Sequence, residues 1–378
     1  MKSLLFISLT TLFLFSGCAT KEETIPVEEK VEVVVPQQDS IKTNTKNMEA
    51  VTFNDIDGFY RDDLNHALDV FKKDCKRAKK NELFKNVCQK AEYETDGYKF
   101  FTINFQPYKL LDDNSLDEGL ITGYYEPLLY GSLRKNNRYK YPIYKTPKDM
   151  LIVDFVSTYP EFAKLKLRAK QVGNKVIPYD SREEIEKNPS KELEPIVYVD
   201  NKVDVFLLHV QGSGKVLLDT GELINVGYAE QNGRKFKGIG MYMLNKGYIT
   251  KDELSAQGMK KYLDKNPSKA DEVLNQNESY VFFQKSNQGA TGSLGTPLTA
   301  KRNIAVDRSV IPLGMPVFLN TTNPVDKKPI NQLMVAADVG GAIKGKVRAD
   351  FFWGFGDSAF DYAGRMKEKG KMYILMPK

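Results

Sequence analysis

The chain of 378 residues is long enough for two or three domains, and its 41% hydrophobic and 28% charged residues are typical of a globular protein. The net charge of +6 is mild, and the lysines and arginines are spread along the chain instead of forming the basic stripe of a nucleic-acid-binding protein. Composition therefore excludes fibrous and wholly disordered chains, and we expect no nucleic-acid partner.

The first residues have the layout of an export signal. Lys2 precedes an apolar run that is too short to span a membrane comfortably, and the small residues Ser16 and Gly17 stand before Cys18. This order is similar to a bacterial lipobox, with residues 1–18 as a lipoprotein signal peptide and Cys18 as the lipidated residue, although Phe15 stands where leucine is usual. A plain signal peptide and an uncleaved anchor are the alternatives.

Lipidation of Cys18 would hold the chain at a membrane surface without a transmembrane helix. Ala19 follows the cysteine, which favours the periplasmic face of the outer membrane of a Gram-negative bacterium. Residues 19–50 alternate charges with valine, proline and glutamine and have no helical period, so they are predicted to be a disordered tether.

Two amphipathic helical patterns follow the tether and end near Glu94. They contain the remaining cysteines, Cys75 and Cys88. Export makes a disulfide chemically allowed, and a pair of helices could bring the two sulfur atoms together. Two buried free thiols are the alternative interpretation.

A β-rich part is predicted to begin with Tyr98–Phe105, and the sequence GYYEP at 123–127 is expected to close one of its strands because proline ends ladder pairing. Successive residues of a strand point to opposite faces. One of the two residues Tyr124 and Tyr125 is therefore predicted to lie in the core, and the other to face a ligand.

Val205–Val210 is predicted to be a strongly apolar strand, and it leads into Gln211-Gly212-Ser213-Gly214. The glycines allow a close approach of the backbone, either to a ligand or to a neighbouring strand in a tight turn. In the first case Gln211 and Ser213 would hydrogen-bond sugar hydroxyl or acetamido groups.

Asp350 is the strongest candidate for chemistry. It stands directly before Phe351, Phe352 and Trp353, the last of which is the only tryptophan. A carboxyl group that is desolvated by aromatic rings stays protonated closer to neutral pH and can then donate a proton to a leaving group. A hairpin whose aspartates cap turns is an equally good explanation.

Two further aspartates lie in the same part of the chain. Asp338 ends an apolar strand, Leu333–Ala337, and precedes a Val-Gly-Gly turn, for which turn capping is the better single explanation. Asp307 could pair locally with its neighbour Arg308.

The sequence lacks the residue patterns of metal sites, of nucleophile–histidine catalysis and of phosphate-binding loops. The two histidines, His66 and His209, match no metal-ligand spacing, and His209 is predicted to be a core residue. No nucleophile elbow is recognisable, and GSGK at 212–215 is too short for a phosphate-binding loop. We expect no metal and no cofactor, which leaves carboxylate chemistry.

Five motifs in a fixed order resemble the membrane-bound lytic murein transglycosylase A (MltA) family, with its C-terminal three-aspartate (3D) domain. They are GYYEP, VQGSG at 210–214, AVDRSVIPLG with Asp307, AADVGGAIKG with Asp338 and VRADFFWG with Asp350. The resemblance covers most of the chain from about Tyr98 onward.

This resemblance implies a mainly β, two-domain fold, in which a double-psi β-barrel carries an inserted second β-barrel domain and a few peripheral helices. Residues 51–126 and 276–378 would form the double-psi barrel, the catalytic domain, with the 3D domain at about 298–378. Residues 127–275 would form the MltA-specific insert, and the glycan would lie in the groove between the two domains.

The resemblance also implies a function. The aspartate that matches Asp350 is the catalytic acid and base of the family, and Asp338 and Asp307 would support it. Such an enzyme cleaves the β-1,4 bond between N-acetylmuramic acid and N-acetylglucosamine of peptidoglycan strands and leaves 1,6-anhydro ends. A hydrolase that uses water, a non-catalytic glycan-binding wall protein and a structural lipoprotein are the alternatives.

The residues expected to bind the glycan lie in these motifs and offer rings or polar groups to sugars: Tyr124, Tyr125, Glu126, Gln211, Gly212, Ser213, Lys344, Phe352 and Trp353. For Lys344, an ordinary solvated lysine is an equally good interpretation.

Overall fold

The computed structural model describes residues 47–164 and 167–378. The expected signal peptide, the lipidation site at Cys18 and the expected tether up to residue 46 lie outside the described residues. Residues 48–50, expected to end the tether, instead form strand β1 (Met48–Ala50), which pairs with β2 (Phe105–Leu110). Among the described residues, no helix is both long and apolar enough to cross a membrane.

Three helices open the described chain: α1 (Leu64–Ala78), α2 (Glu82–Tyr93) and α3 (Gly97–Asn104), after two short 3₁₀ turns at Phe53–Asp55 and Phe59–Arg61. Each α-helix begins at an Asp or Asn whose side chain accepts a backbone N–H, the usual helix N-cap. The expected strand at residues 98–105 is therefore wrong, because helix α3 occupies all but the last of these positions.

A disulfide joins α1 and α2. It links Cys75 to Cys88, whose Cα atoms are 5.5 Å apart. The apolar faces of both helices pack into the main hydrophobic core together with the barrel strands described below.

The catalytic domain expected from the sequence is a closed ring of strands. Its eight-stranded sheet has the order β1-β2-β17-β14-β15-β13-β16-β3, and β17 also pairs with β3, which closes a ring of six strands. The ring strands are β3 (Gly119–Glu126), β13 (Asn303–Val306), β14 (Pro316–Thr322), β15 (Pro329–Asp338), β16 (Arg348–Phe355) and β17 (Lys367–Pro377).

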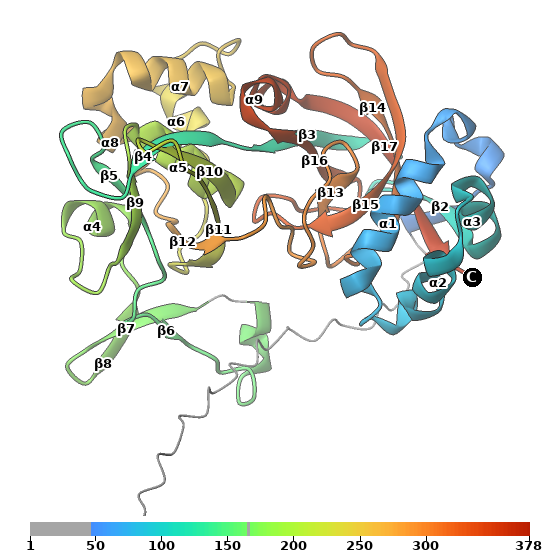
Figure 1. Ribbon diagram of the computed structural model, residues 1–378, viewed down its shortest axis with the longest axis horizontal. Helices are drawn as coiled ribbons and strands as arrows, with labels where there is room; N and C mark the ends of the chain where they lie inside the picture. Colours follow the sequence, from blue (N-terminus) through green and yellow to red (C-terminus); the bar gives the residue numbers. More distant parts are fainter. Residues whose placement is uncertain (1–46, 165–166) are drawn as a thin grey trace, which may run out of the picture. The chain divides into compact units, whose positions relative to one another are not determined.

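The ring combines both kinds of strand pairing. The pairs β13–β15 and β16–β3 are parallel and the other pairs are antiparallel. Helix α9 (Gly356–Arg365) packs on β3 and β16 (Figure 1). The predicted mainly β class is confirmed, and the ring is the arrangement expected of a double-psi barrel.

A second sheet lies between β3 and β13 in the chain. Its order is β12-β11-β10-β4-β9-β5, and its edge strands β12 and β5 approach each other. Its strands are β4 (Leu128–Ser132), β5 (Tyr141–Tyr144), β9 (Pro195–Val199), β10 (Ser213–Leu218), β11 (Leu223–Gln231) and β12 (Val281–Ser286). Because β12 pairs with β11, this sheet extends beyond residue 275, where the insert was expected to end.

Smaller elements complete the insert. A three-stranded sheet consists of β6 (Leu151–Ile152), β7 (Arg168–Val172) and β8 (Lys175–Pro178). The helices are α4 (Arg182–Lys187), α5 (Lys202–Gln211), α6 (Gly240–Asn245), α7 (Ala256–Lys265) and α8 (Ala270–Leu274), with 3₁₀ turns at Pro160–Lys164 and Pro267–Lys269.

The apolar run at 205–210 is helix α5 and not the expected strand. Asn201 caps its N-terminus by accepting the N–H groups of Val203 and Asp204, and Gly212 ends it in the left-handed region with φ of 81°. Most of the helix is buried, so its apolar residues show no helical period in the sequence.

Candidate active site

A row of residues crosses four neighbouring barrel strands. Ala305 on β13 pairs with Asp338 on β15 and with Asp350 on β16, and Asp350 in turn pairs with Thr122 on β3. Residues directly opposite each other on paired strands share a face of the sheet. With strands about 4.8 Å apart, the Cα atoms of the two aspartates lie roughly 10 Å from each other, and only the small alanine separates them.

Asp350 has a hydrogen bond to one of its two carboxyl oxygens and a raised pKa. Thr122 Oγ1 donates a 2.6 Å hydrogen bond to its Oδ1, and no described residue hydrogen-bonds to its Oδ2. Burial and, to a smaller extent, the charge of Asp338 raise the pKa of Asp350 to about 6, against the opposing effects of Thr122 and Arg348. The residue nevertheless keeps partial contact with solvent.

Arg348 holds Thr122 in this position. Its Nη2 donates a 2.9 Å hydrogen bond to Thr122 Oγ1, which leaves the hydroxyl hydrogen for Asp350. Arg348 and Asp350 are two residues apart on β16 and therefore share a face, as alternation along a strand requires.

Asp338 is fixed through one of its two oxygens. Its Oδ1 accepts hydrogen bonds from the N and Oγ of Ser293, each 2.9 Å, and from Val339 N at 2.8 Å. Burial nevertheless raises the pKa of Asp338, since these bonds only partly compensate for the lost hydration. Turn capping explains the hydrogen bonds to Oδ1, and the carboxyl also interacts with the Tyr124 side chain, which favours its ionised form.

Tyr124 lies on the same side as the two aspartates. Its ring is 5.0 Å from that of Phe352, and both rings pack with Ala290 and Ala305 in a small separate cluster. The hydroxyl group is buried and forms no hydrogen bond of normal geometry within the described chain. Burial, followed by the charges of Asp338 and Asp350, raises the pKa of Tyr124 well above its usual value, so the phenol stays protonated.

Tyr125 and Trp353 point to the other face. Tyr125 packs on Phe360 of α9, and Trp353 stacks on Tyr362 of the same helix, with ring centroids 5.0 and 4.6 Å apart. The indole Nε1 donates to Met366 Sδ at 3.2 Å. These two residues belong to the main core and do not line the row of aspartates, and Phe352, which does, is buried as part of its wall.

The position of the Trp353 ring explains why the GYYEP motif begins with a glycine, Gly123. A Cβ atom at position 123 would lie 2.7 Å from the indole Nε1 and 2.9 Å from the Cα of Ala363. The glycine is therefore needed so that β3 can pass beneath the tryptophan and α9.

Glu126 and Gln211 lie where β3 meets the inserted domain. Lys215 Nζ is 3.8 Å from Glu126 Oε2. Burial raises the pKa of this carboxyl, against smaller opposing effects of Lys215 and the backbone of Ala290. Gln211 Oε1 accepts the N–H of Tyr125 at 3.1 Å, which ties α5 to β3. Gly212 ends the helix and Ser213 begins β10, so local structure accounts for both.

Asp307 is saturated with hydrogen bonds. Its Oδ1 accepts from the N of Ser309 at 3.1 Å and from its Oγ at 2.7 Å, and its Oδ2 accepts from Gly345 N at 3.1 Å. Burial alone would raise the pKa of Asp307, but these bonds outweigh burial and the pKa is lowered. Lys344 Nζ is 3.8 Å away and its side chain is 67% exposed, so its ion pair with Asp307 is weak.

Thr122, Arg348 and Ser293 contact the aspartates but were not among the residues expected from the sequence. Arg348 could have been found, because alternation places it on the same face as Asp350. Thr122 lies 228 residues from Asp350 in the sequence, and Ser293 lies 45 residues from Asp338. A local sequence pattern cannot predict contacts over such separations. No group of His, Cys, Asp and Glu side chains within residues 47–164 and 167–378 could hold a metal ion.

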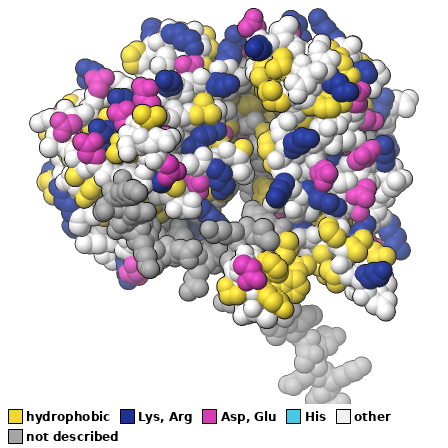
Figure 2. All heavy atoms as spheres, turned by 180° about the vertical axis from the view of Figure 1, so that it is seen from behind, with side chains coloured by type: hydrophobic (Ala, Val, Ile, Leu, Met, Phe, Trp, Pro, Cys, Tyr) yellow, Lys and Arg dark blue, Asp and Glu magenta, His cyan; other side chains and the backbone are white. Residues whose placement is uncertain are grey.

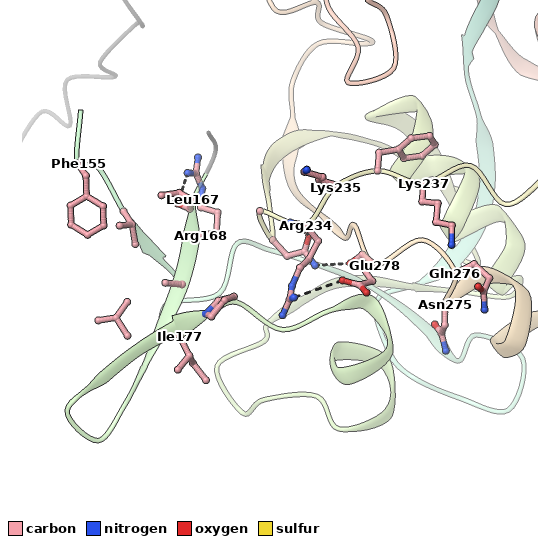
Figure 3. A pocket seen from close by; sticks show the side chains of 17 residues that line it. Phe155, Leu167, Arg168, Ile177, Arg234, Lys235, Lys237, Asn275, Gln276 and Glu278 are labelled. Atoms are coloured by element: carbon pink, nitrogen blue, oxygen red, sulfur yellow. Dashed lines mark hydrogen bonds and ion pairs between the residues drawn. The ribbon is translucent and has the colours of Figure 1, made fainter. Parts of the chain in front are cut away.

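A separate cavity of about 820 Å³ lies in the inserted domain, away from these carboxyl groups (Figure 3). It is lined by the β7–β8 hairpin, residues 232–237 and residues 275–278. Basic and acidic side chains are interspersed over the face that Figure 2 shows.

Comparisons with known proteins agree with this architecture. The MltA-specific insert domain matches residues 120–284, and the 3D domain matches residues 302–376. The first match covers the inserted sheet and ends within β12, and the second contains the three aspartates.

Relatives of known sequence or structure belong to the same family. The chain is 33% identical, over 68% of its length and 65% of the relative, to a membrane-bound lytic murein transglycosylase A homolog of Buchnera aphidicola. The crystal structure of MltA from Neisseria gonorrhoeae is 34% identical with a TM-score of 0.77, covering 87% of this chain and 92% of that one. The lytic transglycosylase LtgG of Burkholderia pseudomallei is 37% identical with a TM-score of 0.58, covering 88% and 96%.

The matched segment spans about two thirds of the curated relative, 65% of its length, but nearly the whole of the two solved structures. With the ring of strands, the insert and the three aspartates all in the expected order, the chain belongs to the MltA family and carries a C-terminal 3D domain.

Proposed function

We propose that this protein is a lytic transglycosylase that cleaves the β-1,4 bond between N-acetylmuramic acid and N-acetylglucosamine in peptidoglycan. One observation carries the proposal: burial raises the pKa of Asp350 to about 6, and Thr122 donates to one carboxyl oxygen while the other accepts no hydrogen bond from the described residues. The names of the relatives, which are lytic transglycosylases, support the same activity.

In the proposed reaction Asp350 first acts as an acid. Thr122 donates to Oδ1, so the acidic proton resides on Oδ2, where it meets the glycosidic oxygen. The C–O bond to the anomeric carbon of the muramic acid breaks as the oxygen takes the proton, and positive charge develops at that carbon. A retaining or inverting glycosidase would need a second carboxylate or a water molecule at this point.

Asp350 then acts as a base. Its carboxylate removes the proton of the muramic acid 6-hydroxyl, whose oxygen attacks the anomeric carbon of the same sugar and closes the 1,6-anhydro ring. Asp350 is thereby protonated again, and no water is consumed. Attack within one molecule has a large advantage in effective concentration over attack by a separate nucleophile.

The neighbouring groups assist the charge changes. Asp338, roughly 10 Å away across Ala305, provides negative charge near the developing cation. The Tyr124 hydroxyl, which interacts with Asp338, and Glu126 Oε1 are buried and form no hydrogen bond of normal geometry within the described chain, and we assign them contacts with a bound sugar. Asp307 holds the loop that carries Lys344, and we assign it a supporting role outside the chemistry.

The protein is proposed to act at a membrane. The curated relative is named as membrane-bound, and Lys2, the apolar run after it and Cys18 have the layout of a lipoprotein signal. We propose a lipid anchor at Cys18 on the periplasmic face of the outer membrane, from which the enzyme reaches the wall.

Product analysis tests the reaction. Purified sacculi incubated with the enzyme are expected to release muropeptides that lack one water relative to hydrolysis products, as measured by mass spectrometry. Products with free reducing ends would identify a hydrolase, and the absence of released products would identify a binding protein. A catalytically inert Asp350→Asn protein serves as the control for contaminating enzymes.

A further inference from the structure

The cavity of the inserted domain has features that the proposed cleavage site does not use. Aliphatic and aromatic side chains of the β7–β8 hairpin and its surroundings form one wall, including Phe155, Val176 and Ile177. The loop after β11, residues 232–237, forms the facing wall, and Asn275, Gln276 and Glu278 complete the lining (Figure 3).

The charge of this lining is strongly one-sided. Four cationic residues, Arg168, Arg234, Lys235 and Lys237, face a single acidic one, Glu278. Arg168 is paired with Glu230 at 2.8 Å, and Arg234 with Glu278 at a loose 3.7 Å. Lys235 and Lys237 are exposed and have no ion-pair partner in the described chain, so two full positive charges are available to a ligand.

Two buried polar atoms of the lining also lack hydrogen bonds within the described chain. They are Asn275 Oδ1, an acceptor, and Arg168 Nε, a donor. Buried polar atoms are usually paired, so an unpaired acceptor and donor in one cavity indicate a ligand that carries N–H groups and oxygen atoms. The complement of this lining is a short acidic peptide with aliphatic groups.

We propose that this cavity binds a peptide stem of peptidoglycan, the short acidic peptide that N-acetylmuramic acid carries on its lactyl group. Carboxylates of the stem would pair with Lys235 and Lys237, its amide groups would pair with Asn275 Oδ1 and Arg168 Nε, and its aliphatic groups would pack on Ile177 and Val176. This proposal rests on the proposed function, because it takes peptidoglycan as the substrate.

The cavity would bind the stem of a sugar that is distant from the cleaved bond. Strand β12 (Val281–Ser286) begins just after Glu278, and the chain beyond it reaches Ser293, which holds Asp338. A strand of this length spans roughly 20 Å, and residues 287–292 follow it before Ser293, so the cavity lining and the residue that contacts Asp338 lie on different sides of β12 in the chain. Binding there would select glycan strands that still carry their stems without touching the reacting atoms.

The experiment compares two charge-reversed proteins. Lys235→Glu/Lys237→Glu alters the cavity, and Lys251→Glu/Lys261→Glu makes the same charge change at two exposed lysines elsewhere in the insert. The probe is the mixture of stem peptides that an amidase releases from sacculi, titrated calorimetrically into the full chain at low salt. We expect about tenfold weaker binding for the cavity variant only, and weaker binding of the wild type as salt rises.

A kinetic arm uses the same proteins. The cavity variant is expected to show a several-fold higher KM, with unchanged kcat, on glycan strands that carry stems, and wild-type kinetics on amidase-stripped strands. No stem binding by the wild type, equal losses in both charge-reversed proteins, or binding of anionic lipid vesicles in place of stems would each overturn the proposal. Since peptide binding needs no turnover, this result is independent of whether Asp350 is catalytic.

Discussion

Asp307 and Asp350 are both aspartates of the 3D domain, yet the barrel places them in opposite chemical situations. Both oxygens of Asp307 accept hydrogen bonds from Ser309 and Gly345, and its pKa is lowered. Asp350 has a bond to one oxygen only, from Thr122, and its pKa rises to about 6. Burial raises the pKa of Asp350, whereas at Asp307 the hydrogen bonds to both oxygens outweigh burial and favour the ionised form.

The largest expected effect follows from removing the reactive carboxyl. Asp350→Asn keeps an acceptor oxygen for Thr122 but cannot transfer a proton, so kcat on sacculi is expected to fall about 10³-fold or more. For the wild type, kcat/KM is expected to fall as pH rises through about 6, because the acid form is lost. Near wild-type turnover of the Asn protein would refute the assignment of Asp350.

The same substitution should stabilise the fold. The pKa of Asp350 rises from 3.8 to about 6 on folding, so across that window the native state holds a proton that the unfolded chain has lost, and stability falls as pH increases. The charged form above pH 6 therefore costs at most about 3 kcal/mol. Urea unfolding of Asp350→Asn at pH 7.5 should show a higher free energy of unfolding than the wild type, and the gain should shrink near pH 4.

Replacement of Asp307, whose two oxygens both accept hydrogen bonds, should lower stability and leave turnover largely unchanged. Asp307→Ala leaves the N–H groups of Ser309 and Gly345 unpaired, and we expect the free energy of unfolding to fall by about 1–3 kcal/mol. Turnover per folded molecule should change by less than about tenfold, since Asp307 donates no proton to substrate. A loss of kcat as large as that of Asp350→Asn, without a loss of stability, would contradict this division of roles.

Much of the barrel could be predicted from local patterns. The apolar run before Asp338 is part of strand β15, the GYYEP motif ends strand β3, and the opposed faces of Tyr124 and Tyr125 follow from alternation along β3. The candidate His209 is a buried core residue, as expected, but it lies in helix α5.

The wrong assignments have local physical causes. The apolar run at 205–210 was expected to be a strand because a buried helix has no polar face to give it a period, although Asn201 before it and Gly212 after it are ordinary helix end signals. Asp96 similarly caps helix α3, where a strand was expected.

The arrangement around Asp350 could not be predicted in the same way. Its partner Thr122 arrives through the parallel pairing of β16 with β3, and Ala305 separates the two aspartates only because β13 lies between β15 and β16. Register between strands that are far apart in sequence depends on the whole barrel. Trp353 was expected to bind the glycan, but its ring belongs to the core beneath α9, and only its neighbour Phe352 lines the site.

The smallest effects concern the neighbours that tune Asp350, and their signs are opposite. The Thr122 bond favours the ionised form, so Thr122→Val should raise the pKa of Asp350 and extend activity to higher pH. The charge of Asp338 disfavours the ionised form, so Asp338→Asn, which keeps an oxygen for Ser293, should shift the falling limb of kcat/KM to lower pH. Shifts of less than about one pH unit are expected for groups of this kind. Parallel shifts in both proteins would mean that the fall in activity above pH 6 belongs to another group, and that Asp350 is not the acid whose titration limits turnover.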